Sequence, residues 1–279
     1  MNVTVLGGSG FIGSALVAAL RRRGDSVRTA SLRDPARAAE ASEGSDVVVN
    51  LAGSPVAERW TEERKREIAR SRSDLPAAYL GQLERLARRP AAYVSASAIG
   101  YYGTSRTATF TESSPPGDDF LARVCVAWEA QALRARDLGL RAAIVRTGLV
   151  LGTGGGALAK LLPLFRSGLG GPVASGEQWC SWIHLDDQIG IYLLAIDGYA
   201  GTLNATAPNP VTNRDFTRAL AAAVHRPALL PAPEFALKLA FGEGAYVVTE
   251  GQRVLPEAAL AAGYRFRYPE IAGACANLV

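Results

Sequence analysis

The segment Gly7-Gly8-Ser9-Gly10-Phe11-Ile12-Gly13 decides the fold, because it joins an apolar strand to an amphipathic helix. The strand is predicted over Val3–Leu6, and the helix follows over Phe11–Arg23 with apolar residues at helical spacing. Read from Gly8, the glycines fit G-x-G-x-x-G, a pattern that lets the backbone approach a pyrophosphate at a helix N-terminus. An ordinary strand-to-helix turn is the alternative. The flanking elements and a further strand at Ser26–Ser31 favour a dinucleotide-binding loop.

Strands and helices alternate outward from this loop. Further strands are expected over 46–51, 91–96 and 141–147, with helices between them over 61–88, broken at Pro76, and over 119–138. The strand at 46–51 is apolar on both faces, as in the middle of a covered parallel sheet. We therefore predict an α/β fold, a Rossmann-type doubly wound parallel sheet. Residues 1–150 are predicted to form an NADP-binding domain. Residues 151–279 are predicted to form a smaller substrate-binding lobe that partly returns to the main sheet.

Composition excludes several classes of protein. The 279 residues are 48% hydrophobic and 20% charged, which is globular, and 30 basic against 26 acidic residues leave a net charge of only +4. No stripe of basic residues with interleaved aromatics suggests nucleic acid, and no apolar run is long enough to span a membrane. The three cysteines lie far apart and the two histidines stand in unrelated contexts, so neither a disulfide framework nor a metal site is expected. We expect a cytoplasmic monomer or homodimer with a small-molecule substrate.

The end of the second strand indicates which dinucleotide binds. An NAD site usually has an acidic residue there for the ribose 2′-hydroxyl, whereas arginine accommodates a 2′-phosphate. Residues 26–32 contain no acid, and Arg33 follows at once. Arg28 and Arg37 lie nearby, although a solvated surface position suits Arg37. NADP(H) is therefore the preferred cofactor, with NAD(H) as the alternative.

Several further motifs follow predicted strands in a fixed order. They are Asn50-Leu51-Ala52-Gly53, Ser95-Ala96-Ser97, Tyr101-Tyr102-Gly103, Arg146-Thr147-Gly148-Leu149-Val150-Leu151-Gly152 and Trp182-Ile183-His184-Leu185-Asp186-Asp187. Together with the glycine loop, this series resembles the short-chain dehydrogenase/reductase superfamily, in its extended or atypical "epimerase family" branch. The likeness covers nearly the whole chain.

The resemblance implies a set of cofactor-binding residues. These are Gly7, Gly8, Ser9, Gly10, Phe11, Ile12, Gly13, Arg33, Leu51, Ala52, Gly53, Ser95, Thr147, Gly148 and Leu149. A flat substrate pocket is expected from aromatic and polar residues, with core packing as the alternative for Trp128. The pocket residues are Tyr101, Trp128, Gln178, Trp179 and Trp182.

The superfamily's Y-x-x-x-K pair is absent from this chain. In that pair the lysine lowers the tyrosine pKa so that the hydroxyl can exchange a proton with the substrate. Leu121 and Cys125 occupy the expected positions, and none of the tyrosines has lysine four residues later. The catalytic candidates are therefore Ser95, Ser97 and Tyr102. A bound water or an acidic hydroxyl of the substrate could also supply the proton.

Three functions follow from these observations. The first is an NADPH-dependent oxidoreductase that reduces a ketone of an aromatic or polyketide natural product, as the ketoreductases of angucyclinone antibiotic biosynthesis do, with a substrate-, serine- or water-assisted proton step. The second is a nucleotide-sugar epimerase or dehydratase, against which the missing Y-x-x-x-K counts. The third is a non-enzymatic NADP(H)-sensing protein, which the same absence permits.

Overall fold

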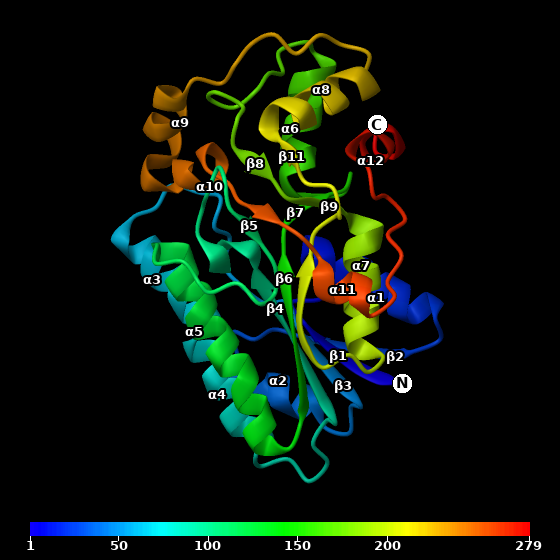
Figure 1. The fold of residues 1–279 in the computed structure, drawn as a ribbon. Helices are drawn as coiled ribbons and strands as arrows, with labels where there is room; N and C mark the ends of the chain where they lie inside the picture. The colour runs from blue at the N-terminus through cyan, green and yellow to red at the C-terminus, as the bar shows by residue number, and fades with distance from the viewer.

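Six parallel strands form the central sheet of the computed structural model, which describes residues 1–279 (Figure 1). Their order across the sheet is β10-β6-β4-β3-β1-β2. The strands are β1 (Asn2–Leu6), β2 (Ser26–Ala30), β3 (Val47–Asn50), β4 (Ala92–Ala98), β6 (Arg141–Thr147) and β10 (Gly201–Ala205). Every pairing is parallel. The predicted fold class is thus confirmed.

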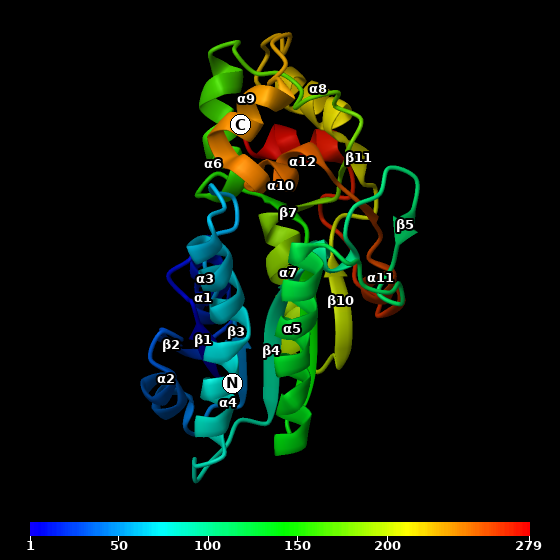
Figure 2. The ribbon, with the colours of Figure 1, turned by 90° about the vertical axis from the view of Figure 1, so that its left-hand side faces the viewer.

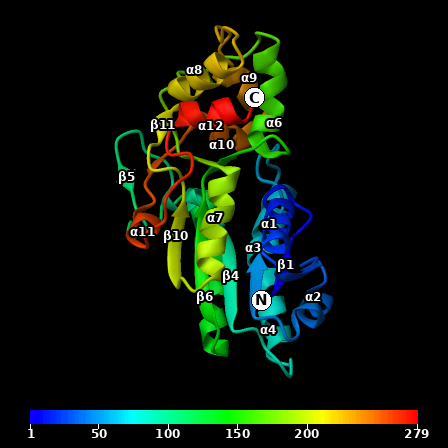
Figure 3. The same cartoon turned by 90° about the vertical axis from the view of Figure 1, so that its right-hand side faces the viewer.

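Helices cover both faces of this sheet. On one face lie α1 (Phe11–Arg22) and α7 (Leu185–Ile196), with α11 (Glu257–Ala261) against β10 (Figure 3). The other face carries α2 (Pro35–Ser42), α4 (Asp74–Leu83) and α5 (Phe120–Arg134), with α3 (Glu62–Arg72) beside α4 and α5 (Figure 2). Val47 and Val49 pack on the α1 side, whereas Val48 packs on the α4 side. This alternation explains why the valines of β3 are apolar toward both faces of the sheet.

An upper lobe stands over the carboxyl ends of the strands (Figure 1). Its core packs Trp182 with Phe165 and Phe216. Around this core and along its border with the sheet lie η1 (Ile99–Tyr102), β5 (Thr109–Phe110), β7 (Leu149–Leu151), α6 (Gly156–Arg166), β8 (Trp179–Cys180), β9 (Trp182–His184), β11 (Val211–Thr212), α8 (Asn213–Ala223), α9 (Glu234–Phe241), η3 (Gly242–Ala245), α10 (Tyr246–Thr249), β12 (Arg253–Val254) and α12 (Ile271–Asn277). The short helix η2 (Ala135–Leu138) instead follows α5 at the other end of the sheet, just before β6. Since β10 belongs to the main sheet, the chain returns from this lobe, while the division at residue 150 stays a prediction. None of the helices has the length and apolar character that crossing a membrane requires.

The helix predicted over 61–88 is interrupted at Ser73, between α3 and α4, and not at Pro76. Pro76 lies in the first turn of α4. Proline is tolerated there because the first backbone N–H groups of a helix have no intrahelical acceptor.

His184 joins the two lobes. It is the N-cap of α7, and its Nδ1 accepts a hydrogen bond from the Asp186 backbone N–H at 3.0 Å. Its Nε2 lies 3.1 Å from Oδ1 of Asn277 in α12. The ring is buried, and this burial lowers its pKa below the ordinary 6.5. The imidazole is therefore a structural hydrogen-bonding group between α7 and the last helix.

Candidate functional site

A cavity of about 530 Å³ opens at the carboxyl ends of β1, β2 and β3. The strand order reverses between β1 and β3, which is where open α/β sheets bind their ligands. The predicted cofactor residues in its wall are Gly7, Gly8, Ser9, Gly10, Arg33, Leu51, Ala52 and Gly53. Three separate parts of the predicted cofactor set thus meet around one space.

The glycine loop is shaped for close approach of a phosphate. A Cβ at Gly13 would collide with the carbonyl oxygen of Gly7, so Gly13 lets α1 pack tightly against the loop. At Gly10 a Cβ would meet only that same oxygen, at 3.4 Å, so this glycine leaves the cavity side open. Gly10 is also the N-cap of α1 and has no side chain to cap it, which leaves N–H groups of the first turn free for an anion. The loop therefore fits a dinucleotide pyrophosphate.

Arg33 lies in the wall of this cavity beyond the end of β2. It is exposed and forms no ion pair. The next residue, Asp34, caps α2 by accepting a hydrogen bond from the Arg37 backbone N–H at 3.1 Å. The acid that follows Arg33 in the sequence is thus engaged in the helix cap, while Arg33 remains available to a 2′-phosphate. The Arg28 guanidinium instead donates to the carbonyl of Glu43.

The loop after β3 is fixed by its own side chains. Asn50 Oδ1 accepts a hydrogen bond from the Ala52 N–H at 3.1 Å, and Asn50 Nδ2 donates to the Tyr93 hydroxyl at 2.9 Å. Nearby, Glu67 of α3 lines the cavity and accepts from Ser54 Oγ at 2.9 Å. The hydrogen bonds from Ser54 and Arg64 lower the Glu67 pKa. Sequence reasoning missed Glu67, because nothing local marks an exposed acid on a charged helix as facing a cavity.

The other predicted cofactor residues surround the cavity without lining it. The Phe11 ring packs against Gly152 and Gly155, where a Cβ would lie 2.8 Å from ring atoms. Gly148 is pressed against the Ser181 carbonyl, and Thr147 Oγ1 accepts a 3.4 Å hydrogen bond from Gln188. The remaining members are Ile12, Gly13, Ser95 and Leu149. Cofactor contact by these residues stays a prediction.

Two of the three catalytic candidates belong to one buried polar network. Ser97, Arg146 and Asn204 stand side by side on β4, β6 and β10, because the strand register pairs them. Ser97 Oγ donates to Glu129 Oε1 of α5 at 2.7 Å. The Tyr102 hydroxyl accepts from Arg146 at 2.9 Å and donates to Asn204 Oδ1 at 2.7 Å. The register thus brings these polar groups together at the ends of three strands.

A paired charge holds the network in place. Arg146 binds Glu129 with two hydrogen bonds of 2.8 and 2.7 Å, and both side chains are less than a tenth exposed. Burial raises the pKa of Tyr102 to about 12, so its hydroxyl stays protonated at neutral pH. Since that proton is donated to Asn204, Tyr102 is suited to structure rather than to proton transfer. Ser95 is buried and donates to the Ala96 carbonyl.

Cys125 of α5 stands in the structural position predicted for the missing lysine. It packs near Gly100, and burial raises the pKa of its thiol to about 12, which leaves the thiol neutral. A positive charge reaches the same place from another helix. The Arg72 guanidinium, at the end of α3, lies over the Trp128 ring at 4.9 Å. Sequence reasoning missed Arg72, because more than fifty residues separate it from Cys125.

None of the predicted substrate residues lines the cavity beside the glycine loop, and a pocket shared by them stays a prediction. Tyr101 is half-buried, and its ring lies 3.4 Å from the Arg146 guanidinium carbon. The Trp179 indole N–H donates a hydrogen bond to the Arg106 carbonyl at 2.9 Å. Gln178 is buried, and its side-chain NH2 donates to the carbonyls of Val173 and Val248. Trp182 differs from the prediction of substrate contact. Its side chain is fully buried in the upper-lobe core, so no surface remains for a ligand.

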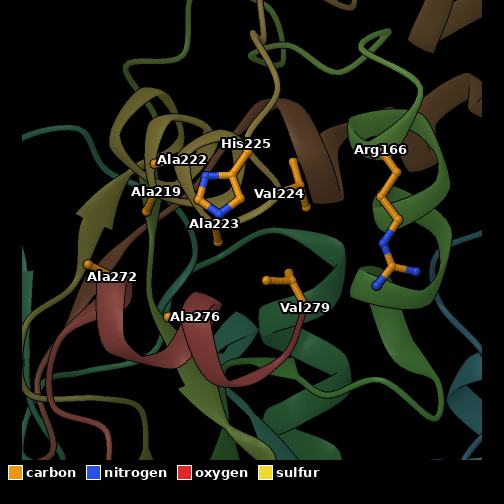
Figure 4. A pocket seen from close by; sticks show the side chains of 9 residues that line it. All are labelled: Arg166, Ala219, Ala222, Ala223, Val224, His225, Ala272, Ala276 and Val279. Atoms are coloured by element: carbon orange, nitrogen blue, oxygen red, sulfur yellow. The ribbon is translucent and has the colours of Figure 1, made fainter.

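A second cavity, of about 720 Å³, lies in the upper lobe away from the sheet ends (Figure 4). Alanines of α8 and α12 line it, with Arg166, His225 and Val279 at its edge. It contains none of the predicted site residues and no group of metal ligands. The cavity beside the glycine loop is therefore the candidate cofactor site.

Comparisons with known proteins show which sequences and structures this chain is similar to. The family model for the NAD dependent epimerase/dehydratase family matches residues 3–206, and a domain of unknown function, DUF1731, matches residues 232–278. The chain is 44% identical to the epimerase family protein SDR39U1 homolog, chloroplastic, of Arabidopsis thaliana, over 96% of this chain and 84% of that protein.

Two crystal structures are also similar to this chain. Human epimerase family protein SDR39U1 with NADPH matches at a TM-score of 0.92 and 36% identity, over 100% of this chain and 99% of that one. The nucleoside-diphosphate sugar epimerase from Corynebacterium glutamicum matches at 0.81 and 33% identity, over 99% of this chain and 57% of that one.

These relatives correct one prediction. The predicted reduction of an aromatic or polyketide ketone in antibiotic biosynthesis is wrong, because the close relatives are SDR39U1-type epimerase-family proteins, including plant and human ones. The missing Tyr–Lys pair had suggested that reading, but its loss does not identify a substrate. The epimerase/dehydratase alternative fits these relatives better. A cytoplasmic location stays a prediction, since the Arabidopsis relative is chloroplastic.

Proposed function

Because this chain belongs to the NAD dependent epimerase/dehydratase family, we propose that it binds NADPH and acts on a nucleoside-diphosphate sugar. The cofactor, when bound, supplies reversible hydride exchange at its nicotinamide. Two named relatives support the two halves of the proposal. The human relative was crystallised with NADPH, and the Corynebacterium relative is a nucleoside-diphosphate sugar epimerase.

The observation that carries the proposal is the cavity at the switch point. It combines an open glycine loop, an uncapped start of α1 and an unpaired Arg33 within one space. The loop and the helix end suit a pyrophosphate, and the arginine suits a 2′-phosphate. Asp34 is held in the α2 cap, and Glu67, the carboxylate in the cavity wall, is bound by Ser54 and Arg64.

Different residues of the chain would then contact different parts of the cofactor and the sugar. The glycine loop would bind the pyrophosphate of the cofactor, and Arg33 would bind its 2′-phosphate. The ring of Tyr101, in η1 directly after β4, is half-buried beside Arg146 and would contact the sugar.

Incubation with nucleoside-diphosphate sugars tests this function. The protein is loaded with NADP⁺ or NADPH and mixed with UDP- and dTDP-hexoses, and products are resolved by chromatography while nicotinamide fluorescence is followed. We expect a change in sugar configuration or oxidation state that requires bound cofactor. The matched control is Gly10→Val, which lacks the open phosphate loop. A sugar product formed equally by this variant would contradict the proposal.

One observation favours a second candidate, a protein that binds NADPH without turnover. Leu121 and Cys125 replace the Tyr–Lys pair, and the Tyr102 hydroxyl is held between Arg146 and Asn204. The same experiment separates the two candidates. Tight NADPH binding with no change in any sugar would favour the binding protein, whose affinity for a partner should then differ between NADPH and NADP⁺.

A further inference from the structure

Arg72 carries a positive charge that no carboxylate neutralises. Its guanidinium is largely buried, and its Nη1 donates only to the Ile68 carbonyl at 3.3 Å and the Ser71 hydroxyl at 3.2 Å. Burial lowers its pKa, and the group that acts to raise it again is the Cys125 thiol, not a carboxylate. Buried charges in proteins are normally paired, so an unpaired guanidinium points to a missing partner.

The surroundings of Arg72 are rich in donors and poor in acceptors. The indole N–H of Trp128, whose ring lies under the guanidinium, is buried and has no hydrogen-bond acceptor. Cys125 is a neutral thiol at physiological pH, since its pKa is about 12. An indole N–H without an acceptor, beside a guanidinium without a carboxylate partner, calls for a ligand with several oxygen atoms.

Arg72 also adjoins the cofactor cavity. A Cβ at Gly53 would lie 3.0 Å from its Nη2, and both Gly53 and Ser71 line the cavity. Arg33 stands at the other end of that cavity, beyond β2, where the 2′-phosphate of the adenosine half would bind. A dinucleotide that starts at Arg33 and crosses the glycine loop therefore reaches Gly53 with its nicotinamide half.

We propose that Arg72 binds the oxygen atoms of the nicotinamide half of the cofactor, its ribose hydroxyls and the adjoining phosphate. In this role it supplies, from α3, the positive charge that the absent lysine of α5 would have brought beside the nicotinamide. The inference rests on the NADPH binding of the proposed function. It makes no use of the sugar substrate.

Binding of cofactor fragments tests this assignment. Calorimetry compares NADPH, reduced nicotinamide mononucleotide and adenosine 2′,5′-bisphosphate on wild type and Arg72→Met, which removes the charge and keeps an unbranched chain. We expect the dissociation constants of NADPH and of the mononucleotide to rise by about 10- to 100-fold, as for loss of charge-assisted hydrogen bonds. Adenosine 2′,5′-bisphosphate should bind as before, whereas Arg33→Ala should weaken it.

The matched control is Arg70→Met, which removes an exposed arginine from the same helix. It should leave all three dissociation constants unchanged. If Arg72→Met does not fold, Arg72→Lys, which keeps the charge but loses the planar fork, takes the same test with a smaller selective loss. Equal weakening of the nicotinamide and adenosine fragments, or no weakening of NADPH, would overturn the inference. Selective weakening without turnover of any sugar would leave it standing while the proposed function fails.

Discussion

Arg33 is the residue on which cofactor choice depends, because it is the one charged group in the cavity wall without a partner. Arg33→Ala should raise the dissociation constant of NADPH by about 10-fold or more, since a charge-assisted contact to the 2′-phosphate is lost. NADH, which lacks that phosphate, should bind with unchanged affinity. Fluorescence titration with both cofactors measures the difference. Arg37→Ala, on the exposed side of α2, is the control, and equal weakening of NADPH and NADH by Arg33→Ala would contradict the assignment.

Substitution of Gly10 and of Gly13 separates the role of a glycine in ligand access from its role in packing. Gly10→Val should abolish NADPH binding while the far-ultraviolet circular dichroism and melting transition persist, because its side chain enters the cavity rather than the protein. Gly13→Val should instead lower the melting temperature, because its Cβ collides with the Gly7 carbonyl. Retained NADPH binding by a folded Gly10→Val variant would show that the loop is only a turn.

At the scale of elements, α5 is attached to the sheet by a buried ion pair. Glu129→Gln leaves the Arg146 charge without its partner, and breaking a buried pair in this way typically costs about 3–5 kcal/mol. We expect a loss of that order in the free energy of unfolding, measured with urea. The exposed i,i+4 pair of α9 supplies the control, since Lys238→Met should leave the free energy of unfolding nearly unchanged. A neutral effect of Glu129→Gln would contradict the structural role of the network.

Local sequence predicted the elements far better than the contacts between them. The strand at Arg141–Thr147 has its predicted bounds, and Asp119 caps α5 where that helix was expected to begin. Those signals lie within a few residues of one another. Glu67 and Arg72 were missed, because their meaning comes from α3 packing beside loops that are distant in sequence. Position in the fold, rather than residue type, makes them part of the candidate site.

At the scale of the whole molecule, His184 makes the stability of the contact between the two lobes depend on pH. Because burial lowers its folded pKa, the unfolded chain takes up a proton first, and stability is lost as the pH falls below about 6.5. Protonation of Nδ1 also removes the acceptor that caps α7, worth roughly 1 kcal/mol. Melting temperatures between pH 8 and 5 should therefore fall on the acid side.

The control for this pH effect is His184→Asn, which can cap the helix and does not titrate. We expect it to flatten the decline of melting temperature below about pH 6.5, whereas His225→Asn, at an exposed position, should keep the decline. Parallel pH profiles for wild type and His184→Asn would show that other groups cause the acid sensitivity.

The position of β10 at the edge of the sheet determines how long β6 stays unpaired during translation. Until the ribosome has extruded residues 201–205, β6 is an open edge whose backbone groups can pair with another nascent chain. The intervening stretch of about 60 residues takes roughly 3–12 s to translate. During that time the apolar face of the sheet that α7 later covers is also bare. A slow codon run placed before β10 would lengthen this exposure, so the messenger RNA as well as the protein should bear on how much chain escapes aggregation.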